Sequence, residues 1–415
     1  MIITAIIAEY NPFHNGHAYM IEKVKKETNA DYIIAIMSGN FTQRGLPSIA
    51  DKFTRAKMAI SCGVSAVFEL PVRFATSSAE LFATGAVSFF EQLSCVNYLS
   101  FGSECGHLSD FSKATEYLLT EPDILKQAIK SYQKQGHSYP KAFSMAIKES
   151  KQAEDFSTEL LSSPNNLLGL EYMKALKRLA SNIKPHTISR TGTGYHDTHS
   201  VFSTDSQTLI ASASAIRSML ETQTGSIASA MPFLPETAYR IFADNYGICA
   251  PITLDDFSLL LSVRLALETR ESLATYLDVS KDLANRIYTF RNEFLLFSDL
   301  IAKIKHKQYT HSRINRALLH ILLNISETKP KTSTLVPYAR LLALRKDASM
   351  LMKQIKASSL IPIITKAADA SKLLNAEANK LFLEDMFVSD LYSKVVSNKY
   401  HSTYIQDIRH PIELI

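Results

Sequence analysis

The sequence has little cysteine, and no two of its four cysteines form a CxxC pair. This scarcity excludes a zinc ribbon and a disulfide-stapled scaffold, and it favours a reducing, cytoplasmic compartment. The chain also lacks any run of 18 apolar residues, so we expect no membrane span. Its first residues lack the basic segment of a signal peptide. We therefore expect a cytoplasmic protein without a membrane-spanning segment.

Glycine is absent from the last 168 residues, because all 13 glycines lie at or before Gly247. Glycine supplies tight turns and lets the backbone approach a ligand closely. The first part of the chain is therefore expected to be a turn-rich α/β domain with a ligand site, and the second part to be packed helices. Acidic residues are scarce in one stretch: residues 303–356 hold 12 Lys and Arg against only Glu327 and Asp347.

Short apolar runs alternate with polar loops and helical patterns in the first part of the chain. Strands are expected at 2–8, 32–37, 66–70 and 97–101. Repeated strand–loop–helix units predict a doubly wound parallel sheet, a Rossmann-like α/β fold. In such a sheet ligands bind at the carboxyl ends of the strands. The polar loops at those ends are residues 9–17, 38–45 and 102–104.

The pattern changes to helical from about residue 253. We predict an all-α region made of helices over 254–270, 271–278, 280–306, 310–325, 337–356 and 368–381. The expected organisation has three parts. Residues 1–225 form the α/β domain with a helical insertion at about 109–160, residues 226–252 form a linker, and residues 253–415 form the basic helical domain.

The tetrapeptide His14-Asn15-Gly16-His17 is the sharpest motif in the chain. It follows the first expected strand and begins the first expected helix, where the helix N-terminus favours anions. Gly16 would let a nucleotide approach the backbone, and the two imidazoles could donate hydrogen bonds to phosphate oxygens. The alternative is a pair of loop histidines with solvated rings.

The segment Ser212-Ala213-Ser214-Ala215-Ile216-Arg217 is a second motif. Ser212 and Ser214 can cap a helix, and with Arg217 they could hold a polyphosphate. Alone this string is typical of an ordinary helix start. Together the HxGH and SxSxxR strings resemble the motifs of the nucleotidyltransferase superfamily, which binds ATP and transfers an adenylyl group with loss of pyrophosphate.

Longer motifs extend the resemblance to one family. They are AEYNPFHNGH at 8–17, MSGNFTQRG at 37–45, ELP at 69–71, FGSE at 101–104 and PNNLLGLEY at 164–172. In this order they resemble the bacterial tRNA(Met) cytidine acetate ligase family. The resemblance implies an enzyme that activates acetate with ATP and then acetylates N4 of the wobble cytidine in elongator tRNA(Met).

The resemblance also implies a set of ATP-binding residues, with Mg²⁺ accompanying the triphosphate. They are Ile7, Ala8, Glu9, Tyr10, Asn11, Pro12, Phe13, His14, Asn15, Gly16, His17, Ala18, Tyr19, Met20, Gly102, Asn165 or Asn166, Arg190, Ser212, Ser214 and Arg217. The loop that contains Arg190 departs from the family pattern. From the residues alone, the asparagine pair after Pro164 is as well explained by a turn or a helix cap.

Four residues are candidates for catalysis: His14, His17, Arg44 and Lys52. Arg44 and Lys52 could neutralise acetate or the α-phosphate, since adenylyl transfer depends on positioning and charge stabilisation. The alternative is the start of a charged surface helix. The roles of the neighbouring Asn40, Asp51 and Arg55, and of Glu104, stay open. The remaining histidines lack metal-ligand spacing, so no dedicated metal site is expected.

Five basic residues are candidates for tRNA binding: Lys303, Lys305, Lys307, Arg313 and Arg316. Clustered positive charge is typical of nucleic-acid-binding surfaces, although solvated helix faces would look the same. Two other functions stay open, a cofactor-type adenylyltransferase acting on a small phosphorylated substrate and a non-catalytic RNA-binding factor. The sequence indicates no protein partner.

Overall fold

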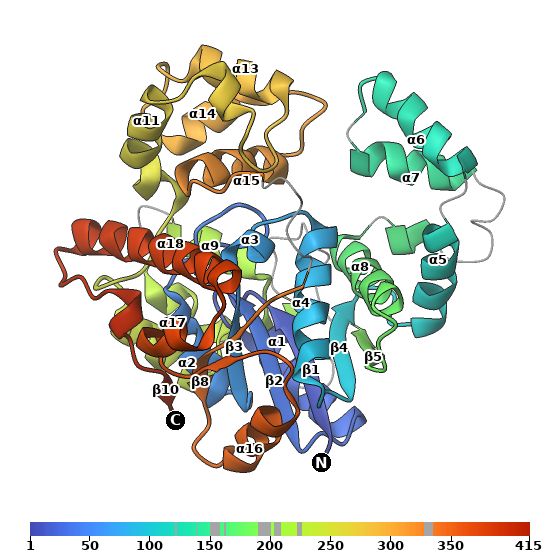
Figure 1. The fold of residues 1–415 in the computed structure, drawn as a ribbon, viewed down its shortest axis with the longest axis vertical. Helices are drawn as coiled ribbons and strands as arrows, with labels where there is room; N and C mark the ends of the chain where they lie inside the picture. Colours follow the sequence, from blue (N-terminus) through green and yellow to red (C-terminus); the bar gives the residue numbers. More distant parts are fainter. Residues whose placement is uncertain are drawn as a thin grey trace.

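The computed structural model describes residues 1–120, 123–137, 139–149, 158–161, 163–189, 201–202, 209–221, 226–327 and 335–415. An eight-stranded sheet lies at the centre of the molecule, with helices on both faces (Figure 1). The helices α11 to α15 form a lobe above the carboxyl ends of the first strands, and α6 and α7 stand beside it. The predicted α/β fold is therefore confirmed.

The sheet has the strand order β10-β8-β3-β2-β1-β4-β5, with β9 pairing with β8. Five strands run parallel: β1 (Ile3–Ala8), β2 (Tyr32–Ser38), β3 (Ala66–Leu70), β4 (Tyr98–Ser103) and β5 (Lys184–Ser189). The order reverses between β1 and β4, because β2 and β3 lie on one side of β1 and β4 lies on the other. Doubly wound sheets bind ligands at this switch point, outside the carboxyl ends of the strands.

Both faces of the sheet are covered, which explains why its strands are apolar runs. Along β2, Ile34 and Ile36 enter one core, while Ile33 and Ala35 enter the other. The first core is covered by α3 (Val72–Ala75), α4 (Ala79–Leu93) and α8 (Pro164–Arg178). The second is covered by α1 (Asn15–Glu27), α2 (Lys52–Ser61), α9 (Ala213–Glu221) and α10 (Glu236–Asn245). Successive side chains of a strand point to opposite faces, so burial on both sides requires a continuous apolar run.

Helices also occupy the segment between β4 and α8, as predicted for 109–160. They are α5 (Leu108–Thr120), α6 (Asp123–Lys134), α7 (Tyr139–Glu149) and the short η2 (Thr158–Leu161). The residues before and after α9 form a two-stranded ribbon, β6 (Val201–Phe202) with β7 (Leu209–Ile210), and the short helices η3 (Ile227–Ser229) and η4 (Met231–Phe233).

Residues 252–327, here called the helical lobe, build a third hydrophobic core around Leu261, Leu300 and Leu318, which α18 (Ala376–Tyr400) completes with Tyr392 and Val395. Its helices are η5 (Leu254–Phe257), α11 (Ser258–Ala266), α12 (Arg270–Leu273), α13 (Lys281–Phe290), α14 (Phe297–Ile304) and α15 (His311–Leu322). The loop after β2 reaches this lobe, because Phe41 belongs to the same core. The predicted helical character of this region is confirmed.

The predicted helix over 337–356 is wrong in its first half. Residues Ala339–Leu344 form β8, which pairs antiparallel with β3, and only Ser349–Ser358 form a helix, α16. Ala, Leu and Arg favour helices locally, but pairing with β3 buries this segment in the sheet, and such tertiary packing outweighs a weak local preference.

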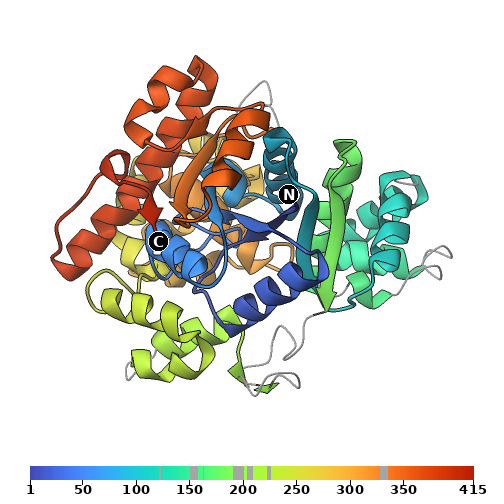
Figure 2. The ribbon, with the colours of Figure 1, turned by 90° about the horizontal axis from the view of Figure 1, so that it is seen from below.

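The rest of the C-terminal region also returns to the sheet, so the expected all-α region from 253 to 415 needs correction. Two further strands, β9 (Ile363–Ile364) and β10 (Glu413–Leu414), pair parallel with β8. Between them lie η6 (Ala367–Asp369), α17 (Ala370–Leu373), α18 (Ala376–Tyr400) and η7 (Asp407–Arg409). Figure 2 shows this orange and red segment at one edge of the sheet, with β5 at the other.

Among the described helices, none combines the length and the apolar character needed to cross a membrane.

Candidate nucleotide-binding site

A pocket opens at the switch point between β1 and β4. It is lined by residues from the start of α1, the end of β4, the end of β5 and the segment before α9: His14, Gly16, His17, Tyr19, Met20, Gly102, Ile188, Ser189, Ile210, Ala211 and Ser212. The structure thus brings together HxGH, Gly102 and Ser212, which are up to 198 positions apart in the chain. It adds Ile188, Ser189, Ile210 and Ala211, for which the sequence carried no signal beyond their nearness to Ser212 and Arg190.

His14 and His17 form the N-terminal cap of helix α1, because the side chain of each accepts a backbone hydrogen bond there. His14 Nδ1 accepts a hydrogen bond from the Gly16 amide at 3.1 Å, and His17 Nδ1 accepts one from the His14 amide at 3.2 Å. The rings stack with centroids 3.7 Å apart. Because a neutral imidazole carries one proton, an Nδ1 that accepts leaves the N–H on Nε2. Both rings are therefore set as Nε2 donors at the N-terminus of a helix.

The glycine between them is required by the His14 ring. A Cβ atom at Gly16 would lie 3.0 Å from His14 Cε1 and 3.1 Å from its Nδ1. Those distances are tighter than ordinary side-chain contacts, and the ring could not retreat without losing its bond to the Gly16 amide. Asn15 anchors the same turn, since its Nδ2 donates to the Leu209 and Pro232 carbonyls at 2.9 and 3.0 Å.

The part of the predicted ATP segment before His14 contributes support rather than pocket wall. Tyr10 and Phe13 are buried and pack with the His17 ring, with centroids 5.0 and 5.4 Å away. Asn11 Oδ1 accepts from the Ile49 amide at 2.8 Å. The aromatic side chains therefore fix the position of His17 from behind.

Glu9, at the end of β1, is the centre of a charged cluster. Its Oε1 accepts from the Gln43 amide at 2.9 Å, which ties the end of β1 to the loop after β2. Burial lowers the pKa of Arg44 and of Arg217, and the Glu9 carboxylate opposes this effect at both guanidinium groups. The predicted catalytic residue Arg44 is therefore close enough to Glu9, at the end of β1, to be stabilised by its negative charge.

The serine–arginine motif is only partly placed as predicted. Ser212 lines the pocket, and its Oγ accepts from the Ala215 amide at 3.2 Å and lies 3.0 Å from Ser214 Oγ. Arg217 does not line the pocket; its Nη1 donates to the Asn11 carbonyl at 2.7 Å. In this structure Arg217 therefore braces the loop that leads to His14.

Arg55 connects the ends of two strands. It is fully buried, its Nε donates to the Ala50 carbonyl at 3.0 Å, and its guanidinium donates to the carbonyls of Glu9, Ser38 and Gly39. The sequence left its role open. The structure shows that Arg55 fixes the loop after β1 to the loop after β2.

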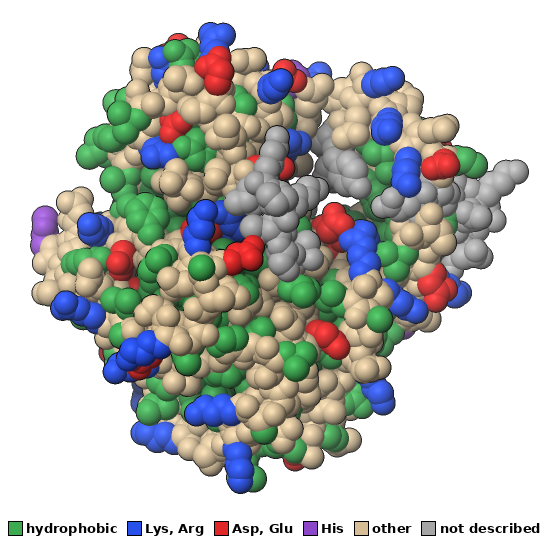
Figure 3. Space-filling model, viewed as in Figure 1, with side chains coloured by type: hydrophobic (Ala, Val, Ile, Leu, Met, Phe, Trp, Pro, Cys, Tyr) green, Lys and Arg blue, Asp and Glu red, His purple; other side chains and the backbone are tan. Residues whose placement is uncertain are grey.

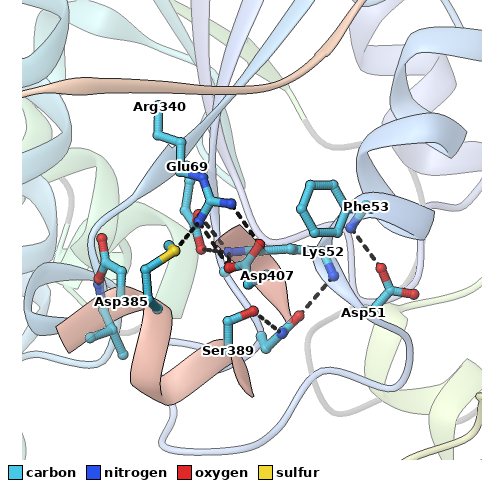
Figure 4. Close-up of polar contacts among 12 residues, drawn as sticks. Asp51, Lys52, Phe53, Glu69, Arg340, Asp385, Ser389 and Asp407 are labelled. Atoms are coloured by element: carbon cyan, nitrogen blue, oxygen red, sulfur yellow. Dashed lines mark hydrogen bonds and ion pairs between the residues drawn. The ribbon is translucent and has the colours of Figure 1, made fainter. Parts of the chain in front are cut away.

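Lys52 lies in the interior, which differs from the predicted contact with acetate or phosphate. Its Nζ contacts both carboxylate oxygens of Glu69 at 2.7 Å and Asp407 Oδ2 at 2.6 Å. Arg340 completes the group, with Nη1 2.9 Å from Glu69 Oε2 and Nη2 2.6 Å from Asp407 Oδ1 (Figure 4). We call Lys52, Glu69, Arg340 and Asp407 the buried ion network.

The network joins the C-terminal segment to the loop after β2. The Lys52 amide donates to Asn40 Oδ1 at 2.8 Å, and Asn40 Nδ2 donates to Ser389 Oγ of α18 at 3.0 Å. Asp51 is the N-cap of α2 and accepts from the Phe53 and Thr54 amides. The positions of Asn40, Asp51 and Lys52 therefore support the loop rather than face a ligand.

The two candidate asparagines differ in what they do. Asn166 is buried, and its Oδ1 accepts from the Glu104 amide at 2.9 Å. In return, Glu104 Oε2 accepts from the Asn166 amide at 3.1 Å, and Glu104 Oε1 accepts from Asn165 Nδ2 at 2.6 Å. This reciprocal lock holds the end of β4, and with it Gly102, against α8. Neither asparagine lines the pocket, and Arg190 lies outside the described residues.

The five predicted tRNA-binding residues fall into two groups. Arg316 is nearly buried and pairs with Asp278 at 2.7 Å, and Lys303 pairs with Glu293 at 3.3 Å. Lys305 and Lys307 are exposed, and no ion pair joins either of them to another residue in the described part of the chain. We call residues 305–307 the basic loop. Arg313 lines a separate groove, considered below.

No group of three or more His, Cys, Asp or Glu side chains among the described residues is arranged to hold a metal ion.

Known proteins match the whole chain. A family model described as HIGH Nucleotidyl Transferase matches residues 1–407. The chain is 38% identical over 414 residues to a tRNA(Met) cytidine acetate ligase of Thermoanaerobacter sp. (strain X514), covering 99% of each protein. It is 37% identical over 415 residues to the protein of the same name from Clostridium perfringens (strain SM101 / Type A), covering 98% of each.

Solved structures give the same result. The fold matches apo TmcAL of Thermotoga maritima with a TM-score of 0.90 and 27% identity, over the full length of both chains. The TmcAL of the same organism bound with alpha-thio ATP matches with a TM-score of 0.87, again over both full lengths. The chain therefore belongs to the HIGH nucleotidyltransferase family and, within it, to the tRNA(Met) cytidine acetate ligases.

Proposed function

We propose that this chain forms acetyl-adenylate from ATP and acetate and then acetylates N4 of the wobble cytidine in elongator tRNA(Met). The observation that carries the proposal is the stacked pair of His14 and His17 at the switch point, with both Nδ1 atoms accepting backbone hydrogen bonds. Further support comes from the relatives of that name and from the neighbouring fold bound with alpha-thio ATP.

The phosphates of ATP would lie at the N-terminus of α1. Two imidazole Nε2–H groups and the helix N-terminus together provide donors for phosphate oxygens, which is the usual chemistry of an anion site. Ser212 lines the same pocket and offers a hydroxyl group. Gly102 at the end of β4 has no side chain, so the nucleoside could approach the backbone there.

In the first step a carboxylate oxygen of acetate attacks the α-phosphorus. The bond between that phosphorus and the oxygen bridging to the β-phosphate breaks, and pyrophosphate leaves. His14 and His17 would stabilise the negative charge that develops on the phosphate oxygens, and Arg44 would attract the acetate. Arg217, Arg55 and the aromatic pair behind His17 hold these groups in place.

In the second step the exocyclic N4 of cytidine attacks the acetyl carbon. A C–N bond forms, the C–O bond to the adenylate breaks, AMP leaves with the electron pair, and N4 loses a proton. The reaction needs no covalent bond to the protein. Lys52 has no place in either step, because its ammonium group is already surrounded by carboxylate oxygens.

Magnesium would arrive on the triphosphate. The described residues form no carboxylate cage, and Mg²⁺ commonly keeps several waters and binds through substrate phosphates. It would neutralise phosphate charge, and the ligands from the protein would be few.

The two steps of substrate handling, ATP chemistry and tRNA binding, would fall to different parts of the chain. Residues 1–225 would carry the ATP chemistry. Residues 226–252, predicted as a linker, pack on the sheet through α10 and would connect it to the helical lobe, which would contact tRNA through its basic loop. An enzyme with this substrate would act in the cytoplasm.

The deciding experiment is mass spectrometry of tRNA nucleosides after incubation with ATP and labelled acetate. We expect the label in N4-acetylcytidine of elongator tRNA(Met), with AMP and pyrophosphate released. Transfer of the adenylyl group of ATP to a small phosphorylated acceptor, or no turnover of ATP in the presence of tRNA and acetate, would contradict the proposal and favour one of the alternative functions.

A further inference from the structure

A second cavity, separate from the nucleotide pocket, lies between the sheet domain and the helical lobe. It encloses about 450 Å³ and shares no lining residue with the nucleotide pocket. Its walls come from the start of α4, from α8, and from the first turns of α15. Figure 3 shows the molecule hollowed between its two upper lobes, with acidic and basic side chains on both sides. We call this cavity the groove; its volume is in the range that holds one small ligand, about 300–1,000 Å³.

The charges in the groove balance. It is lined by three carboxylates, Glu80, Glu171 and Asp278, and by three cations, Lys174, Arg313 and Arg316. The carboxylates already have partners, since Glu171 pairs with Lys174 at 2.9 Å, Asp278 with Arg316 at 2.7 Å, and Glu80 with Arg178. A phosphate would gain little in such a field. A neutral group that carries both hydrogen-bond donors and acceptors would match it.

The rest of the groove suits a flat apolar ring. Leu118, Phe143, Leu167 and Leu170 form an apolar wall. Arg313 also lines the groove, and its guanidinium carbon lies 5.2 Å from the centroid of the Tyr309 ring. Its Nε is buried and has no hydrogen-bond partner among the described residues. Arginine planes and apolar surfaces are the usual stacking partners of unpaired bases.

The groove continues onto the basic loop. Thr310 lines the groove and also borders the surface hollow formed by Lys305, His306 and Lys307. Apart from Arg313, the positive charge that no ion pair compensates in this part of the described chain therefore lies outside the groove, on Lys305 and Lys307 at its entrance. Phosphates contact exposed cations, while bases enter cavities with mixed polar groups, so this arrangement matches one nucleotide of an RNA strand.

One end of the groove reaches the loop after β2, which carries Gln43 and Arg44. Gln43 lines the groove, its Nε2 donates to the Ser77 carbonyl at 3.1 Å, and its amide donates to Glu9 at 2.9 Å. The next residues, Arg44 and Gly45, pass directly over α15, because a Cβ at Gly45 would lie 2.4 Å from the Arg316 amide nitrogen. A base in the groove would therefore lie beside the loop that carries Arg44.

We propose that the groove binds an unpaired nucleobase of the RNA substrate, the one to be modified, while the basic loop holds the adjoining phosphates. This proposal rests on the proposed function and adds the place where the acceptor base enters. A carboxylate accepts from the amino group of cytosine, and Arg or Lys donates to its carbonyl, so Glu171 and Arg313 suit a cytosine. Burial raises the pKa of Glu171, which indicates a carboxylate short of hydration.

The test measures tRNA affinity without ATP or acetate, for the wild type and two variants, each with two RNAs. The two RNAs are elongator tRNA(Met) transcribed with cytidine at the wobble position and the same tRNA with an abasic site there. The two variants are Arg313→Ala, which removes the stacking plane, and Ala79→Phe, which fills the groove from the start of α4. We expect the wild type to bind the abasic tRNA about 10-fold more weakly than the complete one, the usual value of one stacked base.

Each variant should bind the complete tRNA about 10-fold more weakly and the abasic tRNA no more weakly than the wild type does. The salt dependence of binding should be unchanged, because both substitutions act on the base and leave the phosphates bound as before. A matched control, Lys353→Ala with Lys356→Ala, removes two exposed charges from α16 at the far end of the molecule and should leave both affinities unchanged.

Three results would overturn the proposal. The variants could weaken binding of the abasic tRNA as much as binding of the complete tRNA, Arg313→Ala could show a reduced salt dependence, or both variants could bind as the wild type does. Unchanged binding would assign the groove to some other partner. Acetyl-adenylate formation without tRNA is measured separately; its absence in the wild type would contradict the proposed function, whatever the tRNA affinities are.

Discussion

Lysine and arginine occur in two contrasting settings in this molecule. Lys52 and Arg340 lie in the buried ion network with almost no exposed surface. Lys305 and Lys307 lie on the basic loop with their side chains exposed. The first pair is surrounded by carboxylate oxygens of Glu69 and Asp407, whereas the second pair faces solvent. All four are positive charges in the sequence, yet they meet opposite electrostatic environments.

The contrast shows that burial decides what a charge does. Burial alone would raise the pKa of Asp407, but Lys52 and Arg340 lower it well below its ordinary value. Burial alone would lower the pKa of Arg340, but Asp407 and Glu69 raise it. The buried charges therefore depend on each other, and removing one leaves the others without compensation. The exposed charges are hydrated and can exchange water for a phosphate at little cost.

The largest expected effect comes from breaking the buried side of this comparison. Arg340→Met should lower the free energy of unfolding by about 3–5 kcal/mol, because Glu69 and Asp407 would be left buried with Lys52 alone. Urea unfolding followed by circular dichroism measures it. A loss below about 1 kcal/mol, the value of a surface pair, would show that the network is solvated and that the contrast is wrong.

His320 tests the buried side through pH. It is fully buried on α15, with Nδ1 2.9 Å from the Leu277 carbonyl and Nε2 3.1 Å from the Thr76 carbonyl. Burial lowers the pKa of His320 to about 4, although the nearby Asp278 opposes this. The unfolded chain binds a proton near pH 6.5, and the folded chain does so only near pH 4. The stability from this group is therefore present above pH 6.5 and lost as the pH falls toward 4.

The expected slope is about 1.4 kcal/mol per pH unit in that window, to a total of about 3 kcal/mol. The unfolding free energy is measured from pH 4 to 7 for the wild type and for His320→Gln, and the slopes are subtracted so that other groups cancel. Equal slopes in both proteins would mean that His320 titrates normally in the folded state.

The nucleotide pocket lies between the two extremes, because its histidines are partly enclosed but line a pocket that opens to solvent. His14→Ala or His17→Ala should reduce acetyl-adenylate formation by about 10²-fold or more, the loss seen when a charge-stabilising donor is removed. The measurement is adenylate formation from labelled acetate and ATP without tRNA, with circular dichroism to show that the fold is intact. Activity near the wild-type level in both variants would exclude the histidines from the phosphate site.

The smallest effect is expected at the exposed side. Lys305→Ala with Lys307→Ala should reduce the slope of log affinity for tRNA against log salt by about 0.7–0.9 for each phosphate that the basic loop no longer neutralises. The free energy of unfolding should change by less than about 0.5 kcal/mol, as at most surface positions. The Lys353→Ala, Lys356→Ala double variant is the matched control and should keep the wild-type slope. Identical slopes in all three proteins would make the basic loop an ordinary solvated surface.

Charge counted along the chain could not separate these settings. The clustered charge of residues 303–356 indicated a nucleic-acid-binding surface, but Arg340 of that stretch is buried in β8 and Arg316 is paired with Asp278. Lys52 follows a motif loop and so suggested catalysis, yet its partners include Asp407, 355 positions away. Nothing in the residues around Lys52 or Asp407 indicates that pairing, because burial and ion pairing follow from the path of the whole chain.

The sequence by itself determined what is local along the chain: the alternation of strands and helices up to residue 103, the start of a helix at the HxGH motif, and the motif family. Apolar periodicity and a glycine between two histidines are enough for that, since their partners lie within a few residues. Only the tertiary structure decided that 339–344 is a strand, that Arg217 braces Asn11, and that Arg313 and Glu171 face one groove. Those contacts join segments brought together by the sheet and the helical lobe, and long-range packing outweighs local preference where it buries both faces of a segment.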